Sequence, residues 1–379
     1  MECPRCHNKD ITKLYELNGK YYCRDCIKFH RVFIDETRKT DNQLYTPINA
    51  QYNLAFTLTS TQMNISHQLV ENYKQSKNSL VLAVCGSGKT EIVFELIQYA
   101  LNLGHHVCFC VPRKELVIEL YERLVDAFCF VDIGLIYGGC QKNIDAQFII
   151  CTMHQLYRFE NSRGFHLMIA DEVDAFPFYG DRVLQELFER CCVGHWVKLS
   201  ATFSLEDVKA GEELLIMNRR YHGYDLPVPR LIILPSFLQK YILVYLLKKM
   251  KKRTIVYVPK IEMVNELTVF LNHLHIKSRG VSSQHTNNQE TVTALKKDKI
   301  QVIVSTTLLE RGMTIEDVQV IVYCSQHPLF DRRTLIQIAG RVGRKVNHPT
   351  GKIYFLTSER TEGIKSCISS IISLNKMCV

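Results

Sequence analysis

The stretch that decides the fold is Ala83-Val84-Cys85-Gly86-Ser87-Gly88-Lys89-Thr90. An apolar run, 79–84, leads into it as a buried strand would, and a helical pattern over 90–101 follows it. In such a strand–loop–helix unit, glycines let backbone N–H groups turn toward phosphate oxygens at the helix N-terminus. The lysine supplies a charge to the β- and γ-phosphates, and the threonine hydroxyl contacts Mg²⁺. The pattern predicts a nucleoside-triphosphate site that uses Gly86, Ser87, Gly88, Lys89 and Thr90.

Outward from this loop, short apolar runs alternate with helical stretches. Strands are expected at 79–84, 106–111, 148–151, 167–171 and 196–200, and helices at 90–101 and 114–128. The segment 217–230 is polar and aperiodic and contains Gly223, Pro227 and Pro229, which is typical of a linker. Beyond it, strands are expected at 254–258, 302–305, 318–323 and 353–356, and helices at 260–274 and 332–340. This alternation predicts an α/β fold with two parallel-sheet lobes, each sheet covered on both faces.

The composition is typical of a soluble globular protein of two to three domains. The 379 residues are 46% apolar and 22% charged. No apolar run reaches the roughly 20 residues of a membrane-spanning helix, and the N-terminus carries no signal-peptide pattern. Of the 15 cysteines, most lie scattered in apolar runs, which is typical of free thiols in a reducing compartment. We therefore expect a cytoplasmic protein.

The net charge of +9 is concentrated in one part of the chain. Between residues 240 and 300 there are 12 Lys and Arg against 4 Asp and Glu, and the densest part is 248–253. A basic patch indicates a polyanionic partner. The alternative is a solvated helix end at which lysines complement the helix dipole.

Four cysteines near the N-terminus have the spacing of a metal site. Two Cys-x-x-Cys pairs, separated by 16 residues, are formed by Cys3, Cys6, Cys23 and Cys26. Four thiolates on two such turns satisfy tetrahedral Zn²⁺ in a closed, structural site. The alternative is a flexible tail with unpaired cysteines.

Two further motifs have the residue types of nucleotide hydrolysis. Asp171-Glu172-Val173-Asp174 directly follows an expected strand, so Asp171 is placed to hold Mg²⁺ and Glu172 to deprotonate the attacking water. In the second lobe, Gln337-Ile338-Ala339-Gly340-Arg341-Val342-Gly343-Arg344 carries two arginines three residues apart. Guanidinium groups stabilise charge on a transferring phosphoryl group better than ammonium groups do.

Together these motifs resemble motifs I, II and VI of superfamily-2 helicases, in the order found in that superfamily. The resemblance covers roughly residues 56 to 357 and implies two RecA-like lobes. It implies ATP contacts for Gln62 and Gly312, and coupling between nucleotide site and lobes for Ser200, Ala201, Thr202 and Gln337. It further implies nucleic-acid contacts for Arg113, Thr152, His154, Thr306 and Thr307.

The N-terminal cysteine module, the short core and the segment Arg220-Tyr221-His222-Gly223 resemble the ComFA family, whose relatives often have a longer segment before the first cysteine. This resemblance implies a DNA-dependent ATPase that translocates single-stranded DNA during natural transformation, with ATP, Mg²⁺ and one Zn²⁺. It also implies the partners ComFC, a phosphoribosyltransferase-like protein, and ComEC, the membrane DNA channel, which would bring the protein to the inner face of the membrane.

Two alternatives remain open, a duplex-unwinding helicase similar to PriA and a non-catalytic, zinc-dependent DNA-binding adaptor. The expected domains are a zinc module (1–30), a connector (31–55), the first lobe (56–217), a linker (218–232) and the second lobe (233–379).

Overall fold

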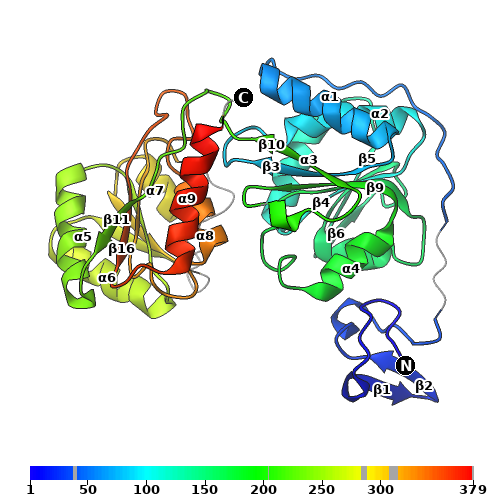
Figure 1. Cartoon of the computed structure of the whole chain (residues 1–379), viewed down its shortest axis with the longest axis horizontal. Coiled ribbons are helices and arrows are strands. Elements are labelled where there is room, and N and C mark those ends of the chain that lie inside the picture. Colours follow the sequence, from blue (N-terminus) through cyan, green and yellow to red (C-terminus); the bar gives the residue numbers. More distant parts are fainter. Residues whose placement is uncertain (37–40, 204, 283–287, 307–314, 378–379) are drawn as a thin grey trace. The chain divides into compact units, whose positions relative to one another are not determined.

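The computed structural model describes residues 1–36, 41–203, 205–282, 288–306 and 315–377. They fall into two compact units (Figure 1). One unit comprises Met1–Leu82 with Gly88–Met217, and the other comprises Ala83–Ser87 with Asn218–Val379. Within the first unit we call residues 1–36 the cysteine module and the large sheet with its helices the first lobe. Asn218–Val379 is called the second lobe.

The first lobe is built on one eight-stranded sheet. Its strand order is β10-β3-β9-β8-β4-β7-β5-β6, and the six strands from β3 to β5 in that order pair in parallel. All residues of β4 and β7 are buried, as expected for strands covered on both faces. The strands are β3 (Asn78–Ala83), β4 (Val107–Val111), β5 (Ile133–Tyr137), β6 (Cys140–Lys142), β7 (Phe148–Thr152), β8 (Phe165–Ala170), β9 (Cys192–Ser200) and β10 (Glu212–Met217).

Helices cover this sheet. Helix α2 packs on β4 and β8, α3 on β4, β5 and β7, and α4 on β9. The helical elements of the lobe are α1 (Ser60–Lys74), η3 (Glu91–Val93), α2 (Phe94–Asn102), α3 (Lys114–Ala127), η4 (Met153–Arg158), α4 (Arg182–Cys191) and η5 (Leu205–Asp207). Helix α1 begins with a capping box, in which Thr59 and Gln62 satisfy each other's backbone N–H groups.

The second lobe has an all-parallel sheet of six strands. The order is β11 (Arg230–Ile233), β16 (Ile353–Thr357), β15 (Gln319–Val322), β12 (Thr254–Tyr257), β14 (Val302–Ser305) and β13 (Ser278–Val281). Its helices are α5 (Ser236–Met250), α6 (Ile261–His273), α7 (Asn288–Lys296), α8 (Arg332–Ala339) and α9 (Glu362–Lys376). Successive β12 residues alternate between two apolar cores, one on each face. The prediction of two parallel-sheet α/β lobes is confirmed.

The cysteine module is a small hairpin with two short 3₁₀ turns. Strand β1 (Leu14–Leu17) pairs antiparallel with β2 (Lys20–Cys23), between η1 (Ile11–Lys13) and η2 (Ile27–Phe29). Asn18 and Gly19 form the two-residue connection with φ of 52° and 80°, which the Asn-Gly pair allows. The module packs on the first lobe, because its four cysteines and Phe29 share an apolar core with residues of β4, β7, β8 and α4.

None of the helices that the structure describes is both long and apolar enough to cross a lipid bilayer.

Candidate functional site

The glycine-rich loop has the backbone conformation that its sequence predicts. Gly86 and Gly88 have φ of 83° and 76°, a region that glycine enters without strain. A Cβ on Gly88 would lie 2.4 Å from Nε2 of Gln62, so a side chain here would displace the end of the Gln62 side chain. Lys89 follows the loop, and Thr90 is buried just before η3. The loop is therefore shaped for close backbone approach to a ligand.

The lysine of this loop lies against the first carboxylate of the acidic motif. Asp171 directly follows β8, and its Oδ1 lies 2.6 Å from Nζ of Lys89. The same oxygen accepts the backbone N–H of Glu172 at 2.6 Å. Burial opposes the charge on Lys89, but Asp171 and Glu172 outweigh it and raise the pKa of the lysine. Burial raises the pKa of the Asp171 carboxyl, and the charge of Lys89 opposes that shift. The ammonium and the carboxyl group thus form one closely coupled, buried pair.

Glu172 has an unusual backbone. Its φ is 52°, in the left-handed region that glutamate rarely adopts. Such conformations concentrate at functional sites, where the surrounding structure maintains them. Here the bond from the Glu172 N–H to Asp171 helps to fix the turn.

A buried hydroxyl relay connects the acidic motif to the end of β9. Thr202 Oγ1 donates to Oδ2 of Asp174 at 3.0 Å and lies 3.2 Å from Oγ of Ser200, which also accepts the Thr202 N–H at 3.0 Å. Ser200 and Thr202 are at most 1% exposed, and Ala201 between them is buried. Two segments that the sequence identifies separately are thus physically joined within one lobe.

Gln62 lies beside the loop but is engaged with protein. Its Oε1 accepts the Thr59 N–H at 2.9 Å, and its Nε2 donates to the Gly88 carbonyl at 3.4 Å. The side chain is 4% exposed. In this structure Gln62 supports the start of α1 and the glycine-rich loop.

The second lobe holds the two arginines of the Gln337–Arg344 motif at the end of α8. Arg341 is 4% exposed, whereas Arg344 is half-buried and its Nε donates to the Gly340 carbonyl at 2.9 Å. Gln337 is buried within α8. Gly312, predicted from the same resemblance, lies outside the described residues.

Arg220 organises this arginine-bearing turn, a role that the sequence interpretation missed. Its guanidinium is 2% exposed and donates to the carbonyls of Gly340 at 3.2 Å, Val342 at 2.6 Å and Gly343 at 2.5 Å. Burial lowers the pKa of Arg220 to about 10. His222 Nε2 lies 3.0 Å from the same Gly343 carbonyl. A short basic run before a proline gives no local signal for such distant carbonyl partners.

The candidate nucleic-acid residues lie where parallel strands end. Arg113 follows β4 as the residue before α3, and Thr152 ends β7 with His154 just beyond it in η4. In the second lobe, Thr306 follows β14 and is half-buried. Thr307 lies outside the described residues. Carboxyl ends of parallel strands are the usual ligand-binding edge of open α/β sheets.

The basic stretch 248–253 lies at the opposite edge of the second-lobe sheet. Lys251 is the left-handed C-cap of α5, and Lys252 and Arg253 stand just before β12 begins. Lys252 pairs with Asp317 at 2.8 Å, and Arg253 pairs with Asp298 at 2.7 Å. The structure therefore favours the helix-end alternative for this stretch.

The four N-terminal cysteines form one buried cluster. The Sγ atoms of Cys3 and Cys26 are 3.7 Å apart, those of Cys6 and Cys23 are 3.6 Å apart, and all four lie within 4.8 Å of one another. Tetrahedral ligation at a Zn–S distance of about 2.3 Å places sulfurs roughly 3.8 Å apart. The donor set and its dimensions therefore fit one zinc ion.

A buried charge cluster fastens the cysteine module to the first lobe, which the sequence did not indicate. Oε2 of Glu160 accepts from Arg5 Nε at 2.8 Å, and Oε1 accepts from Arg190 Nε at 2.8 Å. Arg190 also donates to the Pro4 carbonyl. Arg5 and Glu160 are 3% and 2% exposed. At the rim, Lys28 pairs with Asp181, the N-cap of α4.

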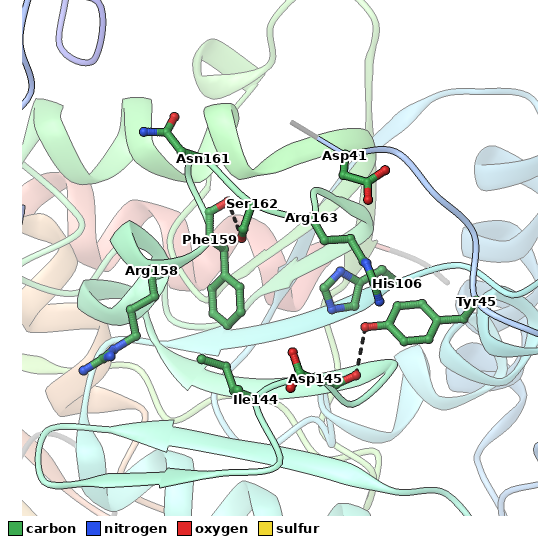
Figure 2. A pocket seen from close by; sticks show the side chains of 10 residues that line it. All are labelled: Asp41, Tyr45, His106, Ile144, Asp145, Arg158, Phe159, Asn161, Ser162 and Arg163. Atoms are coloured by element: carbon green, nitrogen blue, oxygen red, sulfur yellow. Dashed lines mark hydrogen bonds between the residues drawn. The ribbon is translucent and has the colours of Figure 1, made fainter. Parts of the chain in front are cut away.

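A cavity of about 770 Å³ lies elsewhere on the first lobe (Figure 2). Its lining includes His106, Asp145 and Arg163, which precede β4, β7 and β8. The cavity is thus at the edge where these strands begin, while Asp171 follows β8 at the other edge. The Arg163 guanidinium lies 4.4 Å from the ring centre of Tyr45. This cavity is separate from the residues of the candidate nucleotide site.

Comparison with known proteins identifies the family. The competence protein ComFA of Streptococcus pneumoniae is 32% identical over 393 residues, covering 99% of this chain and 90% of the relative. The chain belongs to the ComFA family. The competence protein ComFA of Bacillus subtilis is 28% identical, covering 99% of this ComFA-family chain and 86% of that relative. The predicted resemblance is confirmed.

Domain families agree with this membership. Residues 235–346 of this ComFA-family chain match the helicase conserved C-terminal domain, and residues 55–205 match the type III restriction enzyme, res subunit. The chain is an ATP-hydrolysing enzyme of the helicase class with a role in competence. The alternative of a non-catalytic adaptor is wrong.

Solved structures share the fold. Helicase Lhr of Mycobacterium smegmatis, bound to single-stranded DNA and AMP-PNP, is 17% identical with a TM-score of 0.58, covering 84% of this ComFA-family chain and 50% of that chain. Dbp5 of S. cerevisiae, bound to RNA and ADP BeF3, is 16% identical with a TM-score of 0.57. The match covers 84% of this chain and 92% of the Dbp5 chain. At these identities the likeness shows the fold alone, which is two RecA-like lobes.

Proposed function

We propose that this protein is a single-stranded-DNA-dependent ATPase that moves along the strand and drives DNA uptake during natural transformation. The observation that carries the proposal is the contact of Lys89 with Asp171, next to Glu172, at the carboxyl edge of the first-lobe sheet. A loop lysine, a strand-end aspartate and an adjacent glutamate are the groups that phosphoryl transfer to water needs. The relatives named as competence proteins support the biological setting.

Each residue of the first-lobe site would have one role in ATP hydrolysis. The amides of the 86–90 loop and Lys89 would bind the triphosphate of ATP. Thr90 and Asp171 would hold Mg²⁺, which would supply charge stabilisation to the phosphoryl group. Glu172 orients and deprotonates the attacking water. Lys89 and Asp171 are 2.6 Å apart, so nucleotide would compete with Asp171 for Lys89, and Mg²⁺ would compete with Lys89 for Asp171.

The hydroxyl relay gives the site a route to the rest of the lobe. Asp174 stands in the acidic motif, and Thr202 joins it to Ser200 at the end of β9. A change in the carboxylate cluster on hydrolysis therefore alters the hydrogen bonds of this buried segment. Ser200 and Thr202 would transmit the nucleotide state by this path.

The second lobe contributes the arginines. Arg341 and Arg344 would stabilise charge on the γ-phosphoryl group in the transition state. Arg220 acts as a positioning residue, because its bonds to three carbonyls fix the turn between the two arginines. By resemblance, Gln337 would couple the nucleotide site to the lobes and Gly312 would contact ATP.

We further propose that Cys3, Cys6, Cys23 and Cys26 hold one structural Zn²⁺. All four thiols are buried and clustered at tetrahedral spacing. A module of about 30 residues buries too little apolar surface to fold without a bound metal ion.

The strand is expected to be held through its phosphates. Arg113, Thr152 and His154 in the first lobe and Thr306 and Thr307 in the second are the candidate contacts. Phosphate contacts carry no direct sequence information, which suits a motor that moves along any sequence. ComFC and the ComEC channel are the partners that family membership suggests.

A translocation assay tests this proposal. Streptavidin bound to one end of a biotinylated single strand is displaced by a motor that arrives there, and the rate should require ATP and the presence of the strand. The Glu172→Gln variant is the matched control, since it keeps nucleotide binding. Separation of a duplex without any streptavidin displacement would favour the PriA-like helicase alternative and contradict the translocase.

A further inference from the structure

The outer face of the cysteine module carries a row of aromatic rings. Tyr15 and Tyr22 are directly opposite each other in the β1–β2 register, with ring centres 6.5 Å apart. Phe33 bridges to Tyr22 from the other side, with ring centres 6.3 Å apart. Tyr15 is 43% exposed, and Tyr22 and Phe33 are half-buried. Three neighbouring strand segments thus present three adjacent π systems on one face.

Two arginines lie on these rings. The Arg24 guanidinium is 4.6 Å from the ring centre of Tyr15 and donates to its hydroxyl, and the Arg31 guanidinium is 5.5 Å from the ring centre of Tyr22. Both arginines are exposed. The contacts seen for these two arginines are with tyrosine rings and a tyrosine hydroxyl. The face therefore combines aromatic surface with two planar cations whose charge is available to a ligand.

The face lies close in sequence to two module residues that contact the first lobe at and near His154, one of the candidate nucleic-acid contacts. Phe29 packs on His154 with ring centres 5.9 Å apart, and His30 packs on Tyr157 with ring centres 4.7 Å apart. Arg31 is the next residue. Four residues of extended chain span at most about 14 Å, so the contact at His154 and the aromatic row are near neighbours.

We propose that Tyr15, Tyr22 and Phe33, with Arg24 and Arg31, form a stacking platform for single-stranded nucleic acid that extends beyond the first lobe. This inference rests on the proposed function. Every base has a π face, so stacking on aromatic rings and guanidinium planes is independent of sequence, and nearby cations contact the phosphates. The bases of a duplex are stacked inside the helix and do not reach such a face. The two exposed guanidinium groups favour this polyanion over an apolar protein surface.

The test uses the full-length protein and mixed-sequence single strands of increasing length. Binding is measured by fluorescence anisotropy for wild type, for Tyr15→Leu with Tyr22→Leu, and for Arg24→Gln with Arg31→Gln. Leucine keeps apolar bulk on the strands, and the zinc content of each variant reports that the module has folded. The matched control is Lys9→Gln with Lys13→Gln, which removes the same charge from lysines paired with Glu2 and Asp25.

We expect wild-type affinity to rise with strand length through a step that both face variants lack. Loss of stacking costs about 5- to 150-fold in affinity per base. The arginine variant should also lower the slope of log affinity against log salt by up to about 1.4. The lysine control should keep the step, and ATP turnover at saturating DNA should persist in all variants.

Face variants that retain zinc and bind strands of every length like wild type would overturn the inference and assign the face to a protein partner. In that case the proposed function still holds, provided that single-stranded DNA stimulates ATP turnover by wild type. If wild type itself neither binds nor responds to single strands, both proposals fail together.

Discussion

Glu160→Gln should destabilise the first unit far more than an ordinary surface substitution. One carboxylate serves two arginines, with Oε2 facing Arg5 and Oε1 facing Arg190. In the variant an amide NH₂ group replaces one carboxylate oxygen, so two hydrogen-bond donors face each other. The negative charge that both arginines share is also lost. Because Arg5 and Glu160 are 3% and 2% exposed, water cannot replace the lost partner. Breaking a buried pair of this kind costs about 3–5 kcal/mol.

The expected effect can be expressed as a melting temperature. The first unit holds segments of 82 and 130 residues. For units of this size, about 1 kcal/mol shifts the midpoint by roughly 2–4 °C, so the expected decrease is about 6–20 °C. Trp196 is the single tryptophan of the chain and lies in β9, so its fluorescence reports this unit.

Lys28→Gln is the control for this measurement. It breaks the Lys28–Asp181 pair in the same interface, but the lysine side chain is 51% exposed. An exposed pair contributes about 0.2–1 kcal/mol, so the midpoint should fall by less than about 4 °C. Equal midpoints for Glu160→Gln and Lys28→Gln would refute the reasoning that the cysteine module is anchored by a buried charge cluster.

Four further outcomes are expected. Glu172→Gln should bind ATP but lose roughly 10²–10⁴ in turnover, because only the base is removed; comparison of nucleotide affinity with steady-state rate checks this. Arg341→Ala and Arg344→Ala should each reduce turnover by up to about 10³–10⁵ while ATP still binds, and undiminished turnover of the double variant would exclude this lobe from the reaction. Cys23→Ser should release zinc, as metal analysis would show, and lower the Trp196 midpoint, because the module shares its core with the first lobe. Replacing 251–253 with glutamines should leave the salt dependence of DNA affinity unchanged, since these residues cap α5 or pair with carboxylates; a shallower slope would place them on DNA.

Local rules explain why much of the fold could be predicted. A buried parallel strand has to be an apolar run, so β3 can be recognised in the sequence. A phosphate-binding loop has to carry glycine, which makes Gly86 and Gly88 recognisable, and the position of Asp171-Glu172 follows from the apolar run before it. The apolar stretch 231–247 shows where such rules stop. In the structure it is divided into β11 and α5 around Pro235, which stands at the N-cap of the helix. Length and apolarity alone do not separate those two elements.

Partners far apart in the sequence could not be predicted. In the sequence, Glu160 and Arg190 resemble ordinary surface charges. Their partner Arg5 lies 155 residues before Glu160, so no local pattern indicates the cluster. Arg220 binds carbonyls about 120 residues away, and backbone carbonyls have no sequence signature. Gln62 illustrates the converse, because the local pattern Thr59-x-x-Gln62 is typical of a helix start, whereas the resemblance implies only an ATP contact for this residue.

The order of the strands also lay beyond the sequence pattern. Apolar runs indicate which segments are strands, but not that β3 pairs with β9 more than 100 residues away. The resemblance to helicases implies two RecA-like lobes, which the structure confirms, but the strand order itself comes from the structure.

Single-stranded DNA should stimulate ATP hydrolysis at the Lys89–Asp171 site. The most direct test measures ATP turnover by the full chain with and without single-stranded DNA, for wild type and for Lys89→Ala. DNA should strongly stimulate turnover by wild type, whereas turnover by the variant should stay near background. The variant should still bind DNA, because the candidate DNA contacts are other residues. Turnover in Lys89→Ala equal to wild type, or wild-type turnover that DNA does not change, would contradict this prediction.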